Sequence, residues 1–225
     1  MNSTLKHLQE AESKAAYLFD EIQKRGLIQP GFSEKEINLK ILELAEELLG
    51  IKKYWHKRIV RAGKNTLCPY DENPPEVVVE DDDIVFLDFG PILEEWEADF
   101  GRTYVLGEDP NKQQLAADSE RLWHIANEYL KSNPDLTGAE LYQNCVKIAE
   151  DAGWTFGGPI AGHLIGKFPH EKLEKEDKTN YIHPENHIPL SNKDQNGNQR
   201  FWIIEIHLVD PKIKRGSFFE QIAGY

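Results

Sequence analysis

Two strongly apolar segments of this chain each carry a carboxylate. Asp88 lies in the run IVFLDF at residues 84–89, and Glu205 lies in the run FWIIEI at residues 201–206. Apolar runs this continuous are typical of strands that are buried on both faces of a sheet. Because a buried carboxylate without a partner costs several kcal/mol, each acid requires a positively charged neighbour. For one isolated acid, a structural ion pair with Arg or Lys is the simplest explanation.

The spacing to two further acids favours a different partner. If the first hairpin turns between Leu93 and Glu94, Asp88 lies directly opposite Asp99. If the last hairpin turns between Lys212 and Ile213, Glu205 lies directly opposite Glu220. Side chains in such pairs have Cβ atoms roughly 4.5–5.5 Å apart, and like charges there are destabilising. A bulge or an asymmetric loop would change this register. Two pairs of facing carboxylates predict bound divalent cations rather than a single Arg.

One imidazole is expected to complete such a site, and the chain has eight histidines. His163 and His170 flank a connector, AGHLIGKFPHE, in which glycine allows the backbone to approach a site closely. The histidines of predicted helices and of a polar loop are more simply structural or solvated: His7, His124, His183 and His187. Oxygen ligands with one imidazole suit Mn, Fe, Co or Zn, and two ions in a hydrolytic site lie about 3.5–4 Å apart. Either connector histidine, taken alone, is more often structural, but beside four misplaced acids we expect His163 to be a metal ligand.

Helical and strand patterns follow the same order in both halves of the chain. Capping patterns mark three helix starts, namely Ser33 with Glu36, Asp109 with Pro110, and Thr137 with Glu140. Helices are expected at residues 3–25, 33–50, 109–129 and 137–153, and strands at residues 58–61, 83–90, 98–106, 201–209 and 217–222. Residues 1–108 and 109–225 thus each read helix, helix, hairpin. This pseudo-symmetric order predicts one α+β domain spanning residues 1–225.

The charge of the chain restricts its partners and its compartment. It has 26 Lys and Arg against 39 Asp and Glu, a net charge of −13. Nucleic acids and anionic membranes need a basic surface, so neither is expected as a partner. No segment has the ~20 apolar residues of a membrane span, and the N-terminus lacks the apolar core of a signal peptide. Cys68 and Cys145 form no disulfide framework or zinc motif. We therefore expect a cytoplasmic protein.

Five segments of the chain, taken in order, resemble the pita-bread metallopeptidases. This superfamily contains methionine aminopeptidase, Xaa-Pro aminopeptidase, prolidase and creatinase. The matching segments are DIVFLDFG, EADFGRTYVLG, AGHLIGKFPHE, FWIIEI and GSFFEQI, and the likeness covers most of the chain from residue 58 onward. The resemblance implies a pita-bread fold, in which two helix-helix-hairpin halves surround a curved antiparallel sheet with an internal pseudo-twofold. It also implies a short form with the catalytic domain only.

The resemblance further implies the residues of the site. Two divalent metal ions (Mn, Co, Fe or Zn) would be bound by Asp88, Asp99, His163, Glu205 and Glu220, with Asp99 and Glu220 as bridging carboxylates. His170 matches the histidine that contacts the substrate carbonyl and the tetrahedral intermediate, and Glu205 also matches the general base. The implied chemistry is hydrolysis of the N-terminal peptide bond by a metal-bridging hydroxide.

These features together predict a dinuclear-metal-dependent aminopeptidase. The phrase DFGRTYVLG and the form of the His-Glu motif are closer to the Xaa-Pro branch. A methionine aminopeptidase is the alternative within the superfamily, and a pita-bread scaffold kept for protein binding is the alternative outside catalysis. The partner expected is a peptide substrate, with a homodimer left open.

The chain departs from the superfamily pattern at two places. Tyr70 stands where a substrate-binding histidine usually lies, about eighteen residues before the first metal aspartate. A tyrosine can donate a hydrogen bond but cannot act as a cationic acid near neutral pH. His56 either replaces the missing substrate contact from a nearby loop or caps local structure. Ile206 and His207 follow Glu205 where the superfamily has proline.

Overall fold

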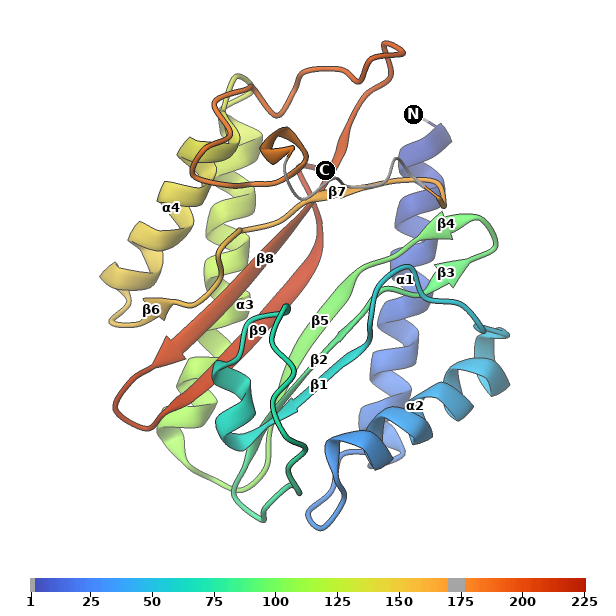
Figure 1. Ribbon diagram of the computed structural model, residues 1–225, viewed down its shortest axis with the longest axis vertical. Helices are drawn as coiled ribbons and strands as arrows, with labels where there is room; N and C mark the ends of the chain where they lie inside the picture. Colours follow the sequence, from blue (N-terminus) through green and yellow to red (C-terminus); the bar gives the residue numbers. More distant parts are fainter. Residues whose placement is uncertain (1–2, 170–176) are drawn as a thin grey trace.

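The structure is a computed structural model that describes residues 3–169 and 177–225 (Figure 1). Helices and strands alternate in blocks along the chain. In chain order, the elements are α1 (Ser3–Lys24), α2 (Glu34–Leu49), β1 (Ile59–Ala62), η1 (Gly63–Leu67), β2 (Ile84–Phe89), β3 (Ile92–Leu93), β4 (Trp96–Glu97), β5 (Phe100–Val105), α3 (Pro110–Ser132), α4 (Gly138–Asp151), β6 (Thr155–Phe156), β7 (Leu164–Ile165), η2 (Lys178–Asn180), β8 (Phe201–Asp210) and β9 (Arg215–Ala223). The expected order of helix, helix and hairpin is therefore present on each side of Val105.

Helices α2, α3 and α4 begin where the capping patterns predict. Ser33 and Glu36 exchange side-chain and backbone hydrogen bonds at the start of α2, and Thr137 and Glu140 do the same at the start of α4. The Asp109 side chain accepts a hydrogen bond from a backbone N–H in the first turn of α3. These bonds satisfy N–H groups that have no partner inside the helix, which is why the sequence signal locates the helix start.

Among the described residues, seven strands form one antiparallel sheet, in the order β1-β2-β5-β9-β8-β6 with β7 paired to β8. The hairpin of β8 and β9 has a long ladder, whereas β5 and β9 meet at a single pair, Gly101 and Glu220. The sheet is therefore built from two hairpin halves joined at this pair. Helices α1 and α2 lie beside the first half, and α3 and α4 lie beside the second (Figure 1).

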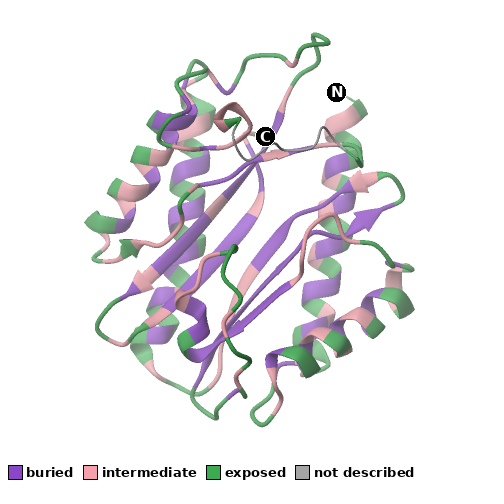
Figure 2. Ribbon diagram, in the orientation of Figure 1, coloured by how far each residue is buried: buried purple, intermediate pink, exposed green. Residues whose placement is uncertain are grey.

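Alternation along the strands separates the core from a cavity. On β2, the side chains that pack against α1 and α2 alternate with Phe86 and Asp88, which line a cavity on the other face. On β8, the side chains that pack against α3 and α4 alternate with Glu205 and His207, which line the same cavity. The core-facing residues are Val85, Leu87 and Phe89 on β2, and Ile204, Ile206 and Leu208 on β8. Buried residues run along both hairpins (Figure 2), as the continuous apolar runs predict.

The predicted strand register is correct in one hairpin and wrong in the other. Glu205 pairs with Glu220, as predicted. Asp88 pairs with Gly101 rather than with Asp99, because the turn lies one residue later, with Glu94 at a φ of 61°. A shift of two residues leaves side chains on the same sheet face, so Asp99, directly before β5, still lies on the face of Asp88.

Within the described ranges, no helix has the length and apolar character needed to span a membrane.

Candidate metal centre

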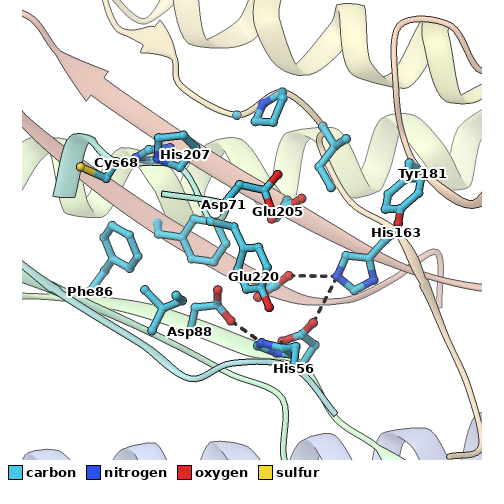
Figure 3. Close-up of a pocket in the computed structure, with 18 of the residues that line it drawn as sticks. His56, Cys68, Asp71, Phe86, Asp88, His163, Tyr181, Glu205, His207 and Glu220 are labelled. Carbon is cyan, nitrogen blue, oxygen red and sulfur yellow. Dashed lines mark hydrogen bonds and ion pairs between the residues drawn. The ribbon is translucent and has the colours of Figure 1, made fainter. Parts of the chain in front are cut away.

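Four carboxylates converge on the cavity from both halves of the sheet. Asp88 comes from the end of β2, Asp99 from the residue before β5, Glu205 from the middle of β8 and Glu220 from β9. Asp88, Asp99 and Glu220 are buried, and Glu205 is partly exposed. Figure 3 shows Asp88, Glu205 and Glu220 directed toward one another across the cavity. Gly101 separates Asp88 from Glu220 within the sheet. A Cβ on Gly101 would lie 2.6 Å from the Phe218 ring, so glycine at this position leaves room for that ring.

His163 reaches the cluster from the glycine-containing connector. A Cβ on Gly162, whose φ is 141°, would lie 2.0 Å from the Ile203 carbonyl oxygen, so glycine is required for the connector to run this close to β8. The Ile203 N–H donates to the His163 carbonyl oxygen at 2.8 Å. The imidazole Nε2 then lies 3.2 Å from Asp99 Oδ2 and 3.6 Å from Glu220 Oε1. Glycine in this connector thus allows the backbone to approach the site closely, as the sequence predicts.

A second imidazole, that of His56, lies on the opposite side of Asp99. Its Nε2 is 3.0 Å from Asp99 Oδ1 and 3.6 Å from Asp88 Oδ1. The sequence left His56 either as a substrate contact or as a local cap, and the structure places its ring against two predicted metal ligands (Figure 3). The ring fits there because residue 90 is glycine: a Cβ on Gly90 would lie 2.1 Å from His56 Cδ2.

The donor set fits divalent cations. Among the described residues, buried oxygens without a hydrogen-bond partner include Asp88 Oδ1, Glu205 Oε1 and Glu220 Oε2. Native proteins seldom leave such buried oxygens without a partner, because the desolvation is not repaid. Three of them in one cavity, beside two imidazoles, match the oxygen and nitrogen ligands of first-row transition metals.

The pKa values of the four carboxyls reflect their burial and their closeness to one another. Burial raises the pKa of Asp88 to about 7 and that of Glu205 to about 8, and it raises the pKa of Glu220 well above its usual range. For Asp99, burial acts upward, but His56 and His163 outweigh it and hold the pKa of that carboxyl below its ordinary value. Protons thus neutralise the cluster when no cation does, and binding of a divalent cation would displace them.

The cavity beside the cluster has a volume of about 300 Å³. One wall is apolar, formed by the packed side chains of Ile59, Phe86 and Phe218. Cys68 and His207 extend this wall, and the His207 Nε2 lies 2.8 Å from the Thr66 carbonyl oxygen. Burial lowers the pKa of His207, so this ring is neutral and packs as part of the wall.

Tyr70 also lines the cavity, but its hydroxyl is hydrogen-bonded to the protein backbone. The hydroxyl oxygen accepts a hydrogen bond from the Lys57 N–H at 3.2 Å, and the ring lies 5.8 Å from the His56 ring. His170 lies outside the described residues. The structure brings together the four carboxylates and His163 that the sequence singled out, and Tyr70 and His56, which the sequence left open, line the same cavity. Asp71, which the sequence did not single out, lines it as well.

Sequence reasoning missed Trp55, which lines the same cavity and packs edge-on against the His163 ring at 5.3 Å. Trp55 Nε1 donates to the Ala98 carbonyl oxygen at 3.0 Å, beside Asp99. Gly90 was the one sequence signal that could have indicated that residues 55–56 pack here. A glycine directly after a buried strand indicates that another segment approaches closely.

A helix-covered antiparallel sheet with carboxylates and imidazoles on its open face is the arrangement of the pita-bread metallopeptidases. The model of metallopeptidase family M24 matches residues 6–198, so the chain belongs to this family. The Xaa-Pro dipeptidase of Lactobacillus delbrueckii subsp. lactis is 28% identical over 174 residues, which are 75% of this chain and 45% of that protein. The chain spans about half or less of the length of the curated relatives it matches.

Solved structures show the same fold. The X-Pro aminopeptidase of Thermotoga maritima MSB8 superposes with a TM-score of 0.75 at 21% identity, over 99% of this chain and 58% of that one. The methionine aminopeptidase of Thermotoga maritima superposes with a TM-score of 0.71 at 18% identity, over 100% of this chain and 94% of that one. The pita-bread fold expected from the sequence is thus confirmed.

Proposed function

We propose that this chain is a metal-dependent exopeptidase that hydrolyses the N-terminal peptide bond of peptides, with preference for an Xaa-Pro bond. The observation that carries the proposal is the convergence of Asp88, Asp99, His163, Glu205 and Glu220 on one cavity. These residues would hold two divalent ions. Asp99 supports this, because it belongs to both of two groups of close ligand atoms, one with Asp88 and one with His163 and Glu220. The ions, when bound, would supply an acidified water and polarise the scissile carbonyl.

The residues of the chain would supply proton transfer and orientation. Glu205 Oε1 is buried without a hydrogen-bond partner, so it is free to take a proton from the attacking water and to deliver it to the leaving nitrogen. His170 is proposed to contact the substrate carbonyl. Tyr70 lines the cavity and is proposed to contact the substrate as well. The apolar wall of Ile59, Phe86 and Phe218 favours an uncharged substrate side chain beside the cluster.

The preference for an Xaa-Pro bond is supported by the Lactobacillus relative, whose name assigns it to Xaa-Pro dipeptides. A methionine aminopeptidase is the second candidate, since the Thermotoga enzyme has nearly the length of this chain. A non-catalytic binding protein is the third. The complete set of five predicted ligands argues against it, because a scaffold kept only for binding has no need of buried facing carboxylates, which destabilise a fold without cations.

One experiment separates these candidates. The purified protein is stripped of metal and then supplied with Mn²⁺, Co²⁺, Fe²⁺ or Zn²⁺ separately. Each form is incubated with Ala-Pro, Ala-Pro-Ala, Met-Ala-Ser and N-acetylated Ala-Pro-Ala. We expect release of alanine from Ala-Pro-Ala but not from the acetylated peptide. The Glu205→Gln variant is the matched control and should be inactive with every metal.

Each alternative gives a different pattern. Cleavage of Ala-Pro alone indicates a dipeptidase, and cleavage of Met-Ala-Ser alone indicates a methionine aminopeptidase. Binding of metal without cleavage of any peptide, or no binding of metal, contradicts the proposed activity and favours the scaffold.

A further inference from the structure

We propose that His56 is a sixth protein ligand of the metal centre, binding through Nε2 the same cation as Asp88 and Asp99. The centre would then use two imidazoles, His56 for one ion and His163 for the other. This inference rests on the proposed metal-dependent function. It adds a ligand that lies 32 residues before Asp88, outside all five segments that carry the resemblance.

The two imidazoles have matching positions around one carboxylate. His56 Nε2 lies 3.0 Å from Asp99 Oδ1, and His163 Nε2 lies 3.2 Å from Asp99 Oδ2. Each Nε2 also lies 3.6 Å from a second carboxylate, Asp88 for His56 and Glu220 for His163. Asp99 is therefore the shared member of two groups, each of two carboxylates and one imidazole. For one carboxylate to bridge two ions that each have their own imidazole, one imidazole must lie beside each of its two oxygens, as is the case for Asp99.

The other nitrogen of each ring is held in the same way. His56 Nδ1 lies 2.7 Å from the Lys57 carbonyl oxygen, and His163 Nδ1 lies 2.8 Å from the Leu164 carbonyl oxygen. A carbonyl oxygen only accepts, so Nδ1 carries the hydrogen in both rings. In a neutral ring, the lone pair is then on Nε2, which faces the carboxylates. Metal-binding histidines are oriented by this kind of outer contact.

The neighbours of His56 fix the ring in that position. Its side chain is only 9% exposed. Gly90 leaves the space that the ring occupies, Trp55 packs edge-on at 4.5 Å, and the Tyr70 hydroxyl accepts a bond from the backbone of the next residue, Lys57. A side chain that contacts substrate needs its polar atom directed at the open cavity. His56 Nε2 is instead directed at two buried carboxylates, which is the position of a ligand.

The consequence is a change in metal preference. Nitrogen ligands favour Co, Zn and Fe over Mn relative to a centre with a single imidazole. Removing His56 should therefore weaken one of the two binding events, and weaken it more for Co²⁺ than for Mn²⁺.

The test measures metal binding directly. Metal-free wild type, His56→Ala and His56→Gln are titrated with Co²⁺ by isothermal calorimetry, and peptide cleavage is measured separately. His124→Ala, an exposed histidine on α3, is the control. We expect two ions in wild type and in the control, and at least about 100-fold weaker binding of one ion in both His56 variants, since even outer contacts of a metal site are worth 10–100-fold.

The outcomes distinguish this inference from the proposed function. Two ions at wild-type affinity in both His56 variants overturn ligation by His56, whether or not cleavage changes. If His56→Gln binds as wild type and His56→Ala does not, His56 only donates a hydrogen bond to Asp99, and ligation is also overturned. Absence of metal binding by wild type contradicts the proposed function itself.

A measurement on the intact site covers variants that fail to fold. Histidine-selective ¹⁵N NMR of Zn²⁺-loaded protein counts imidazoles whose Nε2 is bound to metal. We expect two such rings, both retained in the His170→Ala variant. A single metal-bound ring overturns the inference.

Discussion

Asp99 lies between the imidazoles of His56 and His163, and each of its carboxylate oxygens faces one of them. It is 2% exposed, so no solvent competes for those oxygens. The Asn side chain has nearly the same shape, but an NH₂ group replaces one oxygen and the negative charge is lost. Asp99→Asn therefore removes the charge with little change in packing.

We expect Asp99→Asn to weaken metal binding at least about 100-fold, since it changes a direct ligand and outer contacts alone are worth 10–100-fold. Activity should be lost with it. Metal content after dialysis against a metal buffer is the measurement. Asp81→Asn, the same chemical change on an exposed residue, should behave as wild type. Wild-type metal content in Asp99→Asn would contradict the two-metal centre.

His170 gives a separate prediction, based on the resemblance. If it contacts only the substrate carbonyl, His170→Ala should lower kcat by roughly 10²–10³ and leave the metal content unchanged. Steady-state kinetics and metal analysis on the same preparation check this. Loss of metal together with activity would make His170 a ligand and put the assignment of His163 in question.

At the scale of elements, α1 contacts the hairpin of β8 and β9 through Leu8, which packs against Ile203 and Ile222, and through one carboxyl. Glu12 on α1 accepts a hydrogen bond from the Ile222 N–H on β9, two residues after Glu220. Burial raises the pKa of Glu12 to about 7, although that N–H and the nearby Arg102 act in the opposite direction. The Arg102 guanidinium stacks on the Phe100 ring at 3.7 Å and donates to the Glu220 carbonyl oxygen at 2.9 Å. Besides its apolar contacts, helix α1 is thus joined to β9 by a carboxyl that is costly to ionise.

We predict a pH-dependent effect of Glu12→Gln. The pKa of Glu12 rises from 4.5 to about 7 on folding, so the folded state binds more protons between these values and stability falls as pH rises through them. Glutamine does not ionise, so the variant does not lose this stability as the pH rises. The variant should be more stable than wild type at pH 8, by about 1–3 kcal/mol, and should gain nothing at pH 4.

Urea unfolding of metal-free protein at both pH values measures this difference. The exposed Glu10→Gln on the same helix is the control and should show no pH-dependent gain. An equal effect of Glu12→Gln at pH 4 and pH 8 would contradict the prediction.

At the scale of the whole molecule, the centre lies where the two halves meet. The first half contributes Asp88 and Asp99, and the second contributes His163, Glu205 and Glu220. In the described part of the chain, strand pairing between the two halves is limited to Gly101 and Glu220, and side-chain hydrogen bonds from Arg102 and Thr103 to the β9 backbone lie beside it. Bound cations would therefore connect the halves across the sheet, and neutralise carboxylates that otherwise repel one another.

We expect metal removal to destabilise the entire fold. A ligand present at 1,000 times its Kd stabilises the native state by about 4 kcal/mol, which for a chain of this size is about 10 °C in Tm. Treatment with EDTA should lower the Tm by this amount, and added Co²⁺ or Zn²⁺ should restore it. Potassium chloride at equal ionic strength is the control. An unchanged Tm on removal of metal from a loaded sample would contradict this role.

The helices and the second hairpin could be predicted because their signals are local. Ser33 with Glu36 and Thr137 with Glu140 form bonds within four residues, so the capping patterns locate α2 and α4 from sequence alone. The apolar runs around Asp88 and Glu205 determine which side chains face the core, since alternation along a strand is a property of the backbone. The carboxylates themselves were predicted from these runs, from the hairpin spacing and from the resemblance to the pita-bread metallopeptidases.

The sequence by itself determined the order of elements, the sheet face of each acid and His163 as the expected imidazole. Only the tertiary structure decided the register of the first hairpin and the place of His56. The pairing of Asp88 with Gly101 depends on a turn at Glu94 that adjacent residues fix only loosely. The position of His56 depends on the space left by Gly90 and on the contact with Asp99. Contacts between residues this far apart in the chain arise only when the whole molecule packs, so no local pattern encodes them.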